Sequence, residues 1–370
     1  MKKKILFLIH DLGQGGAEKV LVNLVNNMDP DRFEITVLTL FGGGVNQQFL
    51  KPHIRLITWF PRKFRGNSHV MKLLTPAQLH RLIVREYYDI EVAYLEGPAS
   101  RVISGCSAPN TRIIYWIHCT MKSPEEFAVG FRSVDEAKRS YSRFHRGIFV
   151  SKGVMDAFRD HCPMAQMQVL YNTNETAKMQ EKAMEPVPEG TVPAARVNLI
   201  AMGKLEPVKG FDRLIRIHAR LRREGCDVHT YILGEGRLEA ELKKQARAEG
   251  AADSITFLGY QTNPYKYLAK CDLFVCSSLS EGFSTAATEA LIVGTPVCTV
   301  EVSGMKEMLG EHDEFGIVTD NDENALYSGI KKLLDDPALL SHYKNQAALR
   351  GRNFSTEETV RAVEEMLLNL

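Results

Sequence analysis

The sequence contains two series of short apolar segments that alternate with segments of helical spacing, and this alternation restricts the fold more than any other feature. The first series occupies residues 3–9, 34–40, 54–58, 90–95, 112–118 and 147–151. The second occupies residues 197–203, 229–234, 254–259, 273–278, 295–300 and 316–320. Uninterrupted apolar runs are typical of parallel strands that are buried on both faces. Because helices separate the strands, each series predicts a doubly wound α/β sheet.

The chain is expected to form two Rossmann-like domains, since its 370 residues exceed the length at which one core usually stops growing. We assign residues 1–173 to the first domain and residues 195–353 to the second. Residues 174–194 lack a strand period and contain three prolines, which predicts a linker. Residues 354–370 are expected to form a helix that returns to the first domain. Ligands of such sheets bind outside the carboxyl ends of the strands, so the site is expected in a cleft between the two domains.

The composition is that of a soluble globular protein, with 44% apolar and 25% charged residues. The net charge of +1 conceals an asymmetry: residues 1–180 carry 24 basic and 16 acidic side chains, and residues 181–370 carry 22 and 29. The basic half predicts an anionic partner. The seven cysteines include no CxxC pair, which argues for a reducing compartment and against a disulfide framework or a zinc site. No segment has the length of a secretory signal core or a membrane span, so we expect a cytoplasmic protein.

A glycine-rich loop follows the first apolar segment, with Gly13, Gly15 and Gly16 before a helical segment. Glycines at such a position let the backbone approach a phosphate, and the helix N-terminus supplies free N–H groups. The alternative is a tight strand-to-helix turn without a ligand. The dinucleotide fingerprint requires a glycine where the sequence has Glu18, which weakens an NAD-binding interpretation.

The second series opens with Gly203-Lys204-Leu205-Glu206-Pro207-Val208-Lys209-Gly210, again between a strand and a helix. Two lysines on such a loop can neutralise a diphosphate that gains charge as it leaves. The alternative is a solvated turn.

The most specific segment, 277–291, reads SSLSEGFSTAATEAL after a buried strand. Glu281 is expected on the loop, and Glu289 on the following helix. Residues 282–284 would present backbone N–H groups at the helix start, where an anion can bind. The two carboxylates could then bind separate parts of one ligand. The alternative is that Glu281 caps the helix and Glu289 is a surface residue.

The spacing of Glu281 and Glu289 resembles the E-x7-E signature of the retaining glycosyltransferases of family 4. Further segments follow in the order of that family: GQGGAEK (13–19), YWIHC (115–119), YN (171–172), GKLEPVKGFDRLI (203–215), ILGEGRLEAEL (232–242), FLGY (257–260) and GTPVCTVEVSGMKEML (294–309). The resemblance therefore covers nearly the whole chain, and it is most specific in the second half.

The resemblance implies a B-type glycosyltransferase fold in which the first domain faces the acceptor and the second binds a nucleotide-sugar donor. The residues that it implies in catalysis are Glu281, His118, Lys204 and Lys209. The residues that it implies in donor binding are Gly15, Gly16, Gly203, Gly259, Tyr260, Gly282, Phe283, Ser284 and Glu289. Glu289 would bind the ribose, Glu281 and His118 the donor sugar, and the two lysines the diphosphate.

Two departures from the family pattern leave the donor open. Lys204 stands where an arginine is frequent, so the charge is kept but the planar fork is lost. Ser284 stands where proline or glycine is frequent. His118, taken alone, is more often a structural histidine at a strand end, and only its place in the order of the family segments favours a functional role.

Two Asp-x-Asp pairs could in principle hold a divalent metal on a diphosphate, Asp29 with Asp31 and Asp320 with Asp322. The first precedes a strand beside Pro30 and predicts a turn, and the second precedes a helix and predicts an N-cap. We therefore expect no metal and no cofactor beyond the donor substrate.

Residues 55–74 interleave aromatic and basic side chains, including Trp59, Phe60, Arg62 and Lys63. Such a segment could contact an anionic membrane, where each cation contributes about 1 kcal/mol. A solvated loop with inward aromatics is the alternative. Nucleic-acid binding is not expected, because neither a recognition fold nor a high pI accompanies the segment.

The sequence thus predicts an enzyme that moves a hexose or N-acetylhexosamine from a UDP- or GDP-sugar to a hydroxyl of a glycan or lipid-linked acceptor. A nucleotide-sugar epimerase or other Rossmann enzyme, and a non-catalytic sugar-nucleotide-binding module, remain alternatives.

Overall fold

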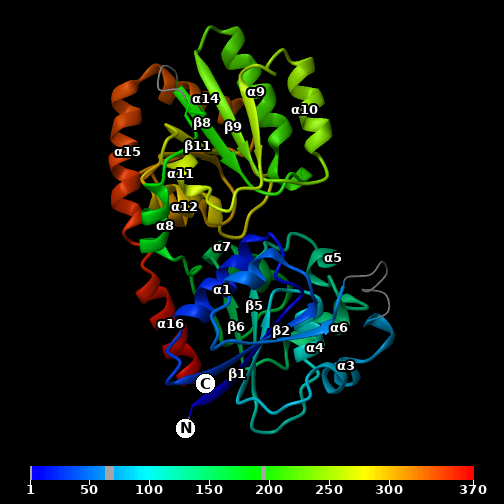
Figure 1. The fold of residues 1–370 in the computed structure, drawn as a ribbon. Helices are drawn as coiled ribbons and strands as arrows, with labels where there is room; N and C mark the ends of the chain where they lie inside the picture. Colours follow the sequence, from blue (N-terminus) through cyan, green and yellow to red (C-terminus); the bar gives the residue numbers. More distant parts are fainter. Residues whose placement is uncertain (1, 63–70, 190, 193–196) are drawn as a thin grey trace. The chain divides into compact units, whose positions relative to one another are not determined.

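The computed structural model describes residues 2–62, 71–189, 191–192 and 197–370 and divides the chain into two units (Figure 1). The N-terminal unit comprises Met1–Asn174 with Thr356–Leu370, and the C-terminal unit comprises Glu175–Ser355. Each unit is a parallel sheet with helices, as the two series of apolar segments predict. Among the described residues, no helix has the length and apolar character needed to cross a bilayer.

The N-terminal sheet has the strand order β3-β2-β1-β4-β5-β6-β7. Its strands are β1 (Lys3–Ile9), β2 (Phe33–Phe41), β3 (Arg55–Phe60), β4 (Ile90–Tyr94), β5 (Arg112–Ile117), β6 (Arg146–Phe149) and β7 (Met167–Val169). Residues Ile5–Ile9 of β1 are fully buried because both faces of the sheet are covered, which explains their unbroken apolar character. The sequence analysis did not predict β7, whose three half-buried residues carry no strand period.

Helices of the N-terminal unit connect these strands, and the last one comes from the end of the chain. They are α1 (Gly16–Asn27), the 3-10 helix η1 (Val45–Phe49), α3 (Pro76–Ile83), α4 (Pro98–Ile103), α5 (Pro124–Phe127), α6 (Val134–Tyr141), α7 (Lys152–His161) and α16 (Thr356–Leu368). Helix α16 packs on α1 (Figure 1). Its Glu364 accepts the backbone N–H of Asp29 at 2.6 Å and pairs with Arg32 at 3.3 Å, so the expected C-terminal helix belongs to this unit.

The C-terminal sheet has the strand order β10-β9-β8-β11-β12-β13. Its strands are β8 (Val197–Met202), β9 (Val228–Leu233), β10 (Ile255–Gly259), β11 (Leu273–Cys276), β12 (Val297–Val300) and β13 (Ile317–Thr319). Its helices are α8 (Thr176–Ala183), the 3-10 helix η2 (Pro207–Lys209), α9 (Phe211–Arg223), α10 (Glu239–Ala248), α11 (Tyr265–Leu268), α12 (Thr285–Ile292), α13 (Met305–Leu309), α14 (Glu323–Asp335) and α15 (Pro337–Gly351).

The segment 174–194, which the sequence analysis treated as a linker, contains helix α8. This helix packs on α11 and α12 (Figure 1), and its Met179 is buried. Gln180 donates to the carbonyl of Ile292 on α12 at 3.4 Å. These contacts place α8 within the C-terminal unit. The prediction that residues 174–194 form no strand is confirmed, but helix α8 was missed because it contributes only one buried apolar side chain.

Candidate functional site

The most specific predicted residues lie where β8 and β11 end, at the middle of the C-terminal sheet. Strand order reverses between these two neighbouring strands, because β9 and β10 lie on one side and β12 and β13 on the other. Such a reversal separates the loops that follow the two strands and leaves a crevice outside the sheet edge. Lys209 follows β8, and Glu281 follows β11, so the fold brings both loops to this crevice.

Backbone contacts hold the two loops together. The N–H of Leu279 donates to the carbonyl of Val208 at 2.7 Å, and the Ser277 hydroxyl donates to the carbonyl of Lys209 at 3.0 Å. Gly210 has a φ of +61°, and a Cβ at this position would lie 2.1 Å from the carbonyl oxygen of Ser277. The approach therefore requires a glycine.

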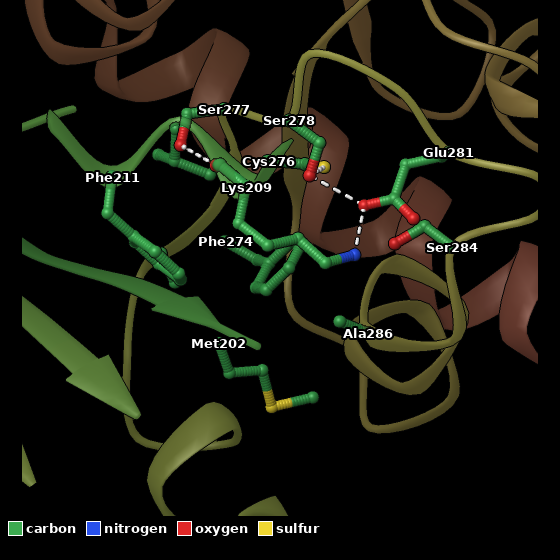
Figure 2. A pocket seen from close by; sticks show the side chains of 12 residues that line it. Met202, Lys209, Phe211, Phe274, Cys276, Ser277, Ser278, Glu281, Ser284 and Ala286 are labelled. Atoms are coloured by element: carbon green, nitrogen blue, oxygen red, sulfur yellow. Dashed lines mark hydrogen bonds and ion pairs between the residues drawn. The ribbon is translucent and has the colours of Figure 1, made fainter. Parts of the chain in front are cut away.

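Lys209 and Glu281 form an ion pair in this crevice. Lys209 Nζ lies 2.6 Å from Glu281 Oε1, and the hydroxyl of Ser278 donates to the same oxygen at 2.6 Å. The side chain of Glu281 is 11% exposed and that of Lys209 is 28% exposed. Figure 2 shows both side chains converging on one point beside the Ser284 hydroxyl. A partly buried carboxylate and ammonium can each exchange the partner for a polar ligand at little cost in charge balance.

The start of α12 lies against the same pocket. The side chain of Ser284 caps the helix by accepting the N–H of Ala287 at 3.3 Å, whereas Glu281 is not the cap. Residues 282–284 are buried. Glu289 is 4% exposed on α12 and does not belong to the side chains that line the pocket, so it is not the exposed surface residue of the alternative interpretation. The structure thus brings Lys209, Glu281 and Ser284 together and leaves Glu289 buried one helical turn beyond them.

The remaining predicted residues of this unit do not belong to the residues that line the pocket. Lys204 is exposed, whereas Gly203, Gly259 and Tyr260 are half-buried. Gly203 lies under the aliphatic stem of Lys209, since a Cβ on it would be 3.6 Å from Lys209 Cδ.

Arg213 is a functional candidate that the sequence analysis missed. This residue on α9 is 6% exposed, and it donates to the carbonyls of Ser277 at 2.7 Å and Ser278 at 2.8 Å. A third bond, of 2.9 Å, reaches Asn321 Oδ1. Burial lowers the pKa of Arg213 from its ordinary value. The guanidinium thus fixes the loop that carries Glu281. Only its position near the start of α9, directly after the loop that carries Lys204 and Lys209, could have drawn attention to it.

In the N-terminal unit, the glycine-rich loop ends at Gly15 and Gly16, where α1 begins. A Cβ on Gly15 would lie 1.8 Å from the Glu18 carboxylate, which therefore folds back over the loop. Asp11 accepts the N–H of Gly13 at 2.8 Å. Two carboxylates thus accompany the glycines in this unit, and an anion would have to bind in competition with them.

His118 lies at the end of β5, beside the end of β4. Its ring is 4.6 Å from that of Tyr94 and 6.2 Å from that of Trp116, measured between centroids. Burial lowers the pKa of His118 to about 3, so the imidazole is neutral at physiological pH. Within the described part of the chain, His118 Nε2, Tyr94 Oη and Trp116 Nε1 are buried without a hydrogen-bond partner. Three unpaired polar atoms at one strand edge are unusual for a purely structural cluster.

Backbone strain also occurs at the end of β4, beside the end of β5 where His118 lies. Leu95 follows β4 with a φ of +108°, which a branched residue rarely adopts. The carboxylate of the next residue, Glu96, accepts the N–H of His118 at 3.0 Å. Strained residues of this kind concentrate at functional sites. Sequence reasoning overlooked both residues because neither belongs to a motif.

The Asp-x-Asp pairs occupy the structural positions predicted for them. Asp29 accepts the N–H of Asp31 at 2.8 Å within a turn, and Asp322 caps α14 by accepting the N–H groups of Asn324 and Ala325.

The aromatic and basic segment 55–74 is described only in part, since residues 63–70 lie outside the described residues. In the described part, Leu73 is 77% exposed and Phe60 is 38% exposed. Arg55 pairs with Glu86 at 2.5 Å, which neutralises one of the expected cations.

Two parallel Rossmann-like units make up the fold of the B-type glycosyltransferases, whose solved structures match the whole chain. Residues 14–177 match the profile of Glycosyltransferase Family 4, and residues 191–350 match that of Glycosyl transferases group 1. The two matches span both units, and the chain belongs to this family of glycosyltransferases.

Among curated relatives, the chain is 28% identical over 375 residues to the N-acetylgalactosamine-N,N'-diacetylbacillosaminyl-diphospho-undecaprenol 4-alpha-N-acetylgalactosaminyltransferase of Campylobacter jejuni. This similarity covers 99% of the chain and 100% of the relative. The chain is also 24% identical over 331 residues to LpsE, a lipopolysaccharide core biosynthesis glycosyltransferase of Rhizobium meliloti, covering 88% of the chain and 87% of the relative.

Solved structures share the fold over the whole chain. The crystal structure of Anabaena HepE in complex with UDP and glucose superposes with a TM-score of 0.81 at 23% identity and covers 100% of both chains. That of WaaG, a glycosyltransferase involved in lipopolysaccharide biosynthesis, has a TM-score of 0.73 at 15% identity and covers 98% of this chain and 99% of that one.

Proposed function

We propose that this glycosyltransferase transfers a hexose or N-acetylhexosamine from a UDP-sugar to a hydroxyl of a lipid-diphosphate-linked glycan, with retention of configuration. The proposal that a nucleotide sugar binds here rests on the Lys209–Glu281 ion pair. The two residues lie 2.6 Å apart on the loops that follow β8 and β11, next to the N-terminus of α12. The acceptor class rests on the Campylobacter jejuni relative, whose name specifies a diphospho-undecaprenol-linked acceptor. The choice of UDP over GDP rests on the HepE structures, which contain UDP and UDP-glucose.

The pocket chemistry suits departure of a nucleoside diphosphate. The ammonium of Lys209, assisted by the exposed Lys204, would neutralise the charge that develops on the leaving phosphate oxygen. Glu281 would then exchange its bonds to Lys209 for hydroxyls of the donor sugar. Glu289 would bind the ribose, and Gly282, Phe283 and Ser284 would contribute backbone N–H groups.

The reaction we propose needs no protein nucleophile. The bond between the anomeric carbon and the phosphate oxygen breaks, and the acceptor hydroxyl oxygen bonds to that carbon from the same face. The hydroxyl proton passes to the departing phosphate oxygen. In such a step the protein contributes position and charge, without a metal ion.

In the N-terminal unit, the neutral His118 offers a donor or acceptor to a sugar hydroxyl, depending on its tautomer. Gly15 and Gly16 remain candidates for donor contact. We further propose that the protein acts at the inner face of the cell membrane, through peripheral contact of residues 55–74 with anionic lipid, since exposed apolar side chains such as Leu73 accompany the cations.

The test is a transfer assay with purified protein, a polyprenyl-diphosphate-linked oligosaccharide and a panel of UDP- and GDP-sugars, with the product analysed by mass spectrometry and NMR. We expect transfer from a UDP-sugar, undiminished in EDTA, with one anomeric configuration throughout. The Glu281→Gln variant should lose activity by orders of magnitude. The Glu239→Gln variant is the matched control, because Glu239 pairs with Lys243 at the same 2.6 Å on exposed α10.

Three outcomes would contradict the proposal. Isomerised nucleotide sugar without acceptor would indicate an epimerase, and donor binding without transfer or donor hydrolysis would indicate a binding module. Full transfer by the Glu281→Gln variant would remove the carboxylate from the mechanism.

A further inference from the structure

A buried group of three potential metal-binding side chains lies in the N-terminal unit, away from the strand ends that carry the proposed chemistry. His80 belongs to α3, Glu91 is the second residue of β4, and Cys106 follows α4. One ligand atom from each lies within 4.8 Å of the other two. The three residues share no motif spacing in the sequence, so only the fold reveals the group.

Glu91 is an ionisable residue in the middle of an apolar sheet. It pairs in register with Leu6 of β1 on one side and Ile113 of β5 on the other, and it is only 2% exposed. A carboxylate in such surroundings needs a positive partner, which is either a cationic side chain or a metal ion. In the structure His80 Nε2 lies 2.7 Å from Glu91 Oε2, and the Cys106 thiol donates to Oε1 at 3.7 Å.

We propose that His80, Glu91 and Cys106 form a binding site for one Zn²⁺ ion. An imidazole, a carboxylate and a thiolate are the three ligand types that zinc accepts in proteins. Thiolate and imidazole disfavour Mg²⁺ and Ca²⁺, which prefer sets of oxygen ligands. This inference reverses the expectation from cysteine spacing alone, and it does not depend on the transfer reaction.

The geometry requires a rearrangement at Glu91, because His80 contacts Oε2 and Cys106 contacts Oε1, whereas a carboxylate that binds through one oxygen must bring both neighbours to the same ion. Tetrahedral zinc with bonds of about 2.0–2.3 Å separates a sulfur and an oxygen ligand by roughly 3.5 Å, close to the 3.7 Å between Cys106 Sγ and Glu91 Oε1. The nitrogen–oxygen separation has to open from 2.7 Å to about 3.3 Å. The His80 side chain is 13% exposed and that of Glu91 is 2% exposed, so solvent reaches the group from the side of His80, where a water molecule would be the fourth ligand.

The ligand set matches the charge of a zinc ion. In the bound state a neutral imidazole, a carboxylate and a thiolate together carry two negative charges, and the protons that the ligands give up leave to solvent. The dipositive ion balances these charges, so zinc adds bonds without adding an uncompensated charge to the interior. The ion would link α3, β4 and the end of α4, and its effect would be on stability.

The experiment uses tag-free full-length protein stripped with EDTA and dialysed against ZnCl₂, with bound metal measured by mass spectrometry. We expect one zinc per chain, and an unfolding midpoint raised by about 5–10 °C at zinc near 100 times its dissociation constant. Co²⁺ in place of zinc should give a thiolate-to-cobalt charge-transfer absorption.

Variants identify the ligands. His80→Gln and Cys106→Ser should each weaken zinc binding by at least about tenfold, and Cys106→Ser should abolish the cobalt–thiolate absorption. Cys162→Ser is the matched control, because Cys162 is another buried cysteine of the same unit, outside the group. Circular dichroism checks that each variant folds, and His80→Gln, at the more exposed ligand, is the milder change.

The proposal is overturned if the stripped protein takes up less than one tenth of an equivalent at micromolar zinc. It is equally overturned if binding survives both His80→Gln and Cys106→Ser, or if it is lost in Cys119→Ser instead, since Cys119 is the exposed thiol.

Discussion

Lys209 Nζ and Glu281 Oε1 lie 2.6 Å apart, although 72 residues separate them in the chain. The ion pair forms because β8 and β11 are neighbours in the sheet and because Gly210 lets their loops touch. Sequence reasoning assigned the lysine to a diphosphate and the carboxylate to a sugar. The structure adds that each is the other's partner.

The Lys209–Glu281 ion pair leads us to expect that substitutions of its two residues affect UDP binding differently. Lys209→Met should weaken UDP binding about 10- to 100-fold, because a charge-assisted hydrogen bond contributes about 1.5–3 kcal/mol. Glu281→Gln should leave UDP binding unchanged or make it severalfold tighter, because it removes a negative charge beside the diphosphate and releases Lys209. Isothermal titration with UDP measures both. Equal weakening by the two variants would show that the pair has only a structural role.

Arg213 should act as a positioning residue for Glu281. Arg213→Lys keeps the charge but cannot maintain three fixed donors, so the carbonyls of Ser277 and Ser278 lose partners. We expect kcat for transfer to fall about 10- to 100-fold, while the thermal shift caused by UDP persists. The control is Arg216→Lys on the same helix, where the guanidinium is 40% exposed. If kcat is unchanged in both variants, Arg213 serves stability alone.

Gly210→Ala should destabilise the C-terminal unit more than Gly225→Ala. Both glycines have positive φ, of +61° and +84° respectively, so both substitutions cost about 1–2 kcal/mol in backbone strain. Only at Gly210 does the added Cβ meet a backbone atom, the carbonyl of Ser277 at 2.1 Å, whereas nothing lies within 4 Å at Gly225. Urea denaturation and transfer assays compare them. Equal midpoints and equal activities would exclude the close contact between the two loops.

His218 should make the C-terminal unit less stable in mild acid. Its side chain is fully buried between Thr230 Oγ1 at 2.8 Å and Ser254 Oγ at 2.7 Å, and burial lowers its pKa to about 3. The unfolded chain takes up a proton near pH 6.5, so stability present above that pH is lost as the pH falls toward 3. At pH 5.5 the loss is about 1.4 kcal/mol.

Urea midpoints at pH 7.5 and 5.5 measure this loss. His218→Gln should remove the part that arises in the C-terminal unit, since His118, whose pKa is also lowered to about 3, adds a loss of the same sign in the N-terminal unit. His342→Gln is the control, because His342 is exposed on α15. A wild-type protein whose stability is flat between these pH values would contradict the assignment.

The sequence predicted twelve of the strands, most of them because a buried parallel strand is an unbroken apolar run, as Ile5–Ile9 illustrates. Edge strand β7 and helix α8 were not predicted, since each buries too few apolar side chains to create a strand or helix periodicity in the sequence. The loop that carries Lys204 and Lys209 and the loop that carries Glu281 were also predictable, because ligands of such a sheet bind outside the carboxyl ends of its strands.

The sequence alone therefore determined the class of fold, the two nucleotide-type sheets and the loops on which the chemistry lies. Tertiary structure alone decided which atoms meet: Lys209 with Glu281, Arg213 with the carbonyls of the Glu281 loop, and Glu91 with His80 and Cys106. The reason is that hydrophobic periodicity is a local property of the chain, whereas these partners are brought together by strand order and by close backbone approaches between distant segments.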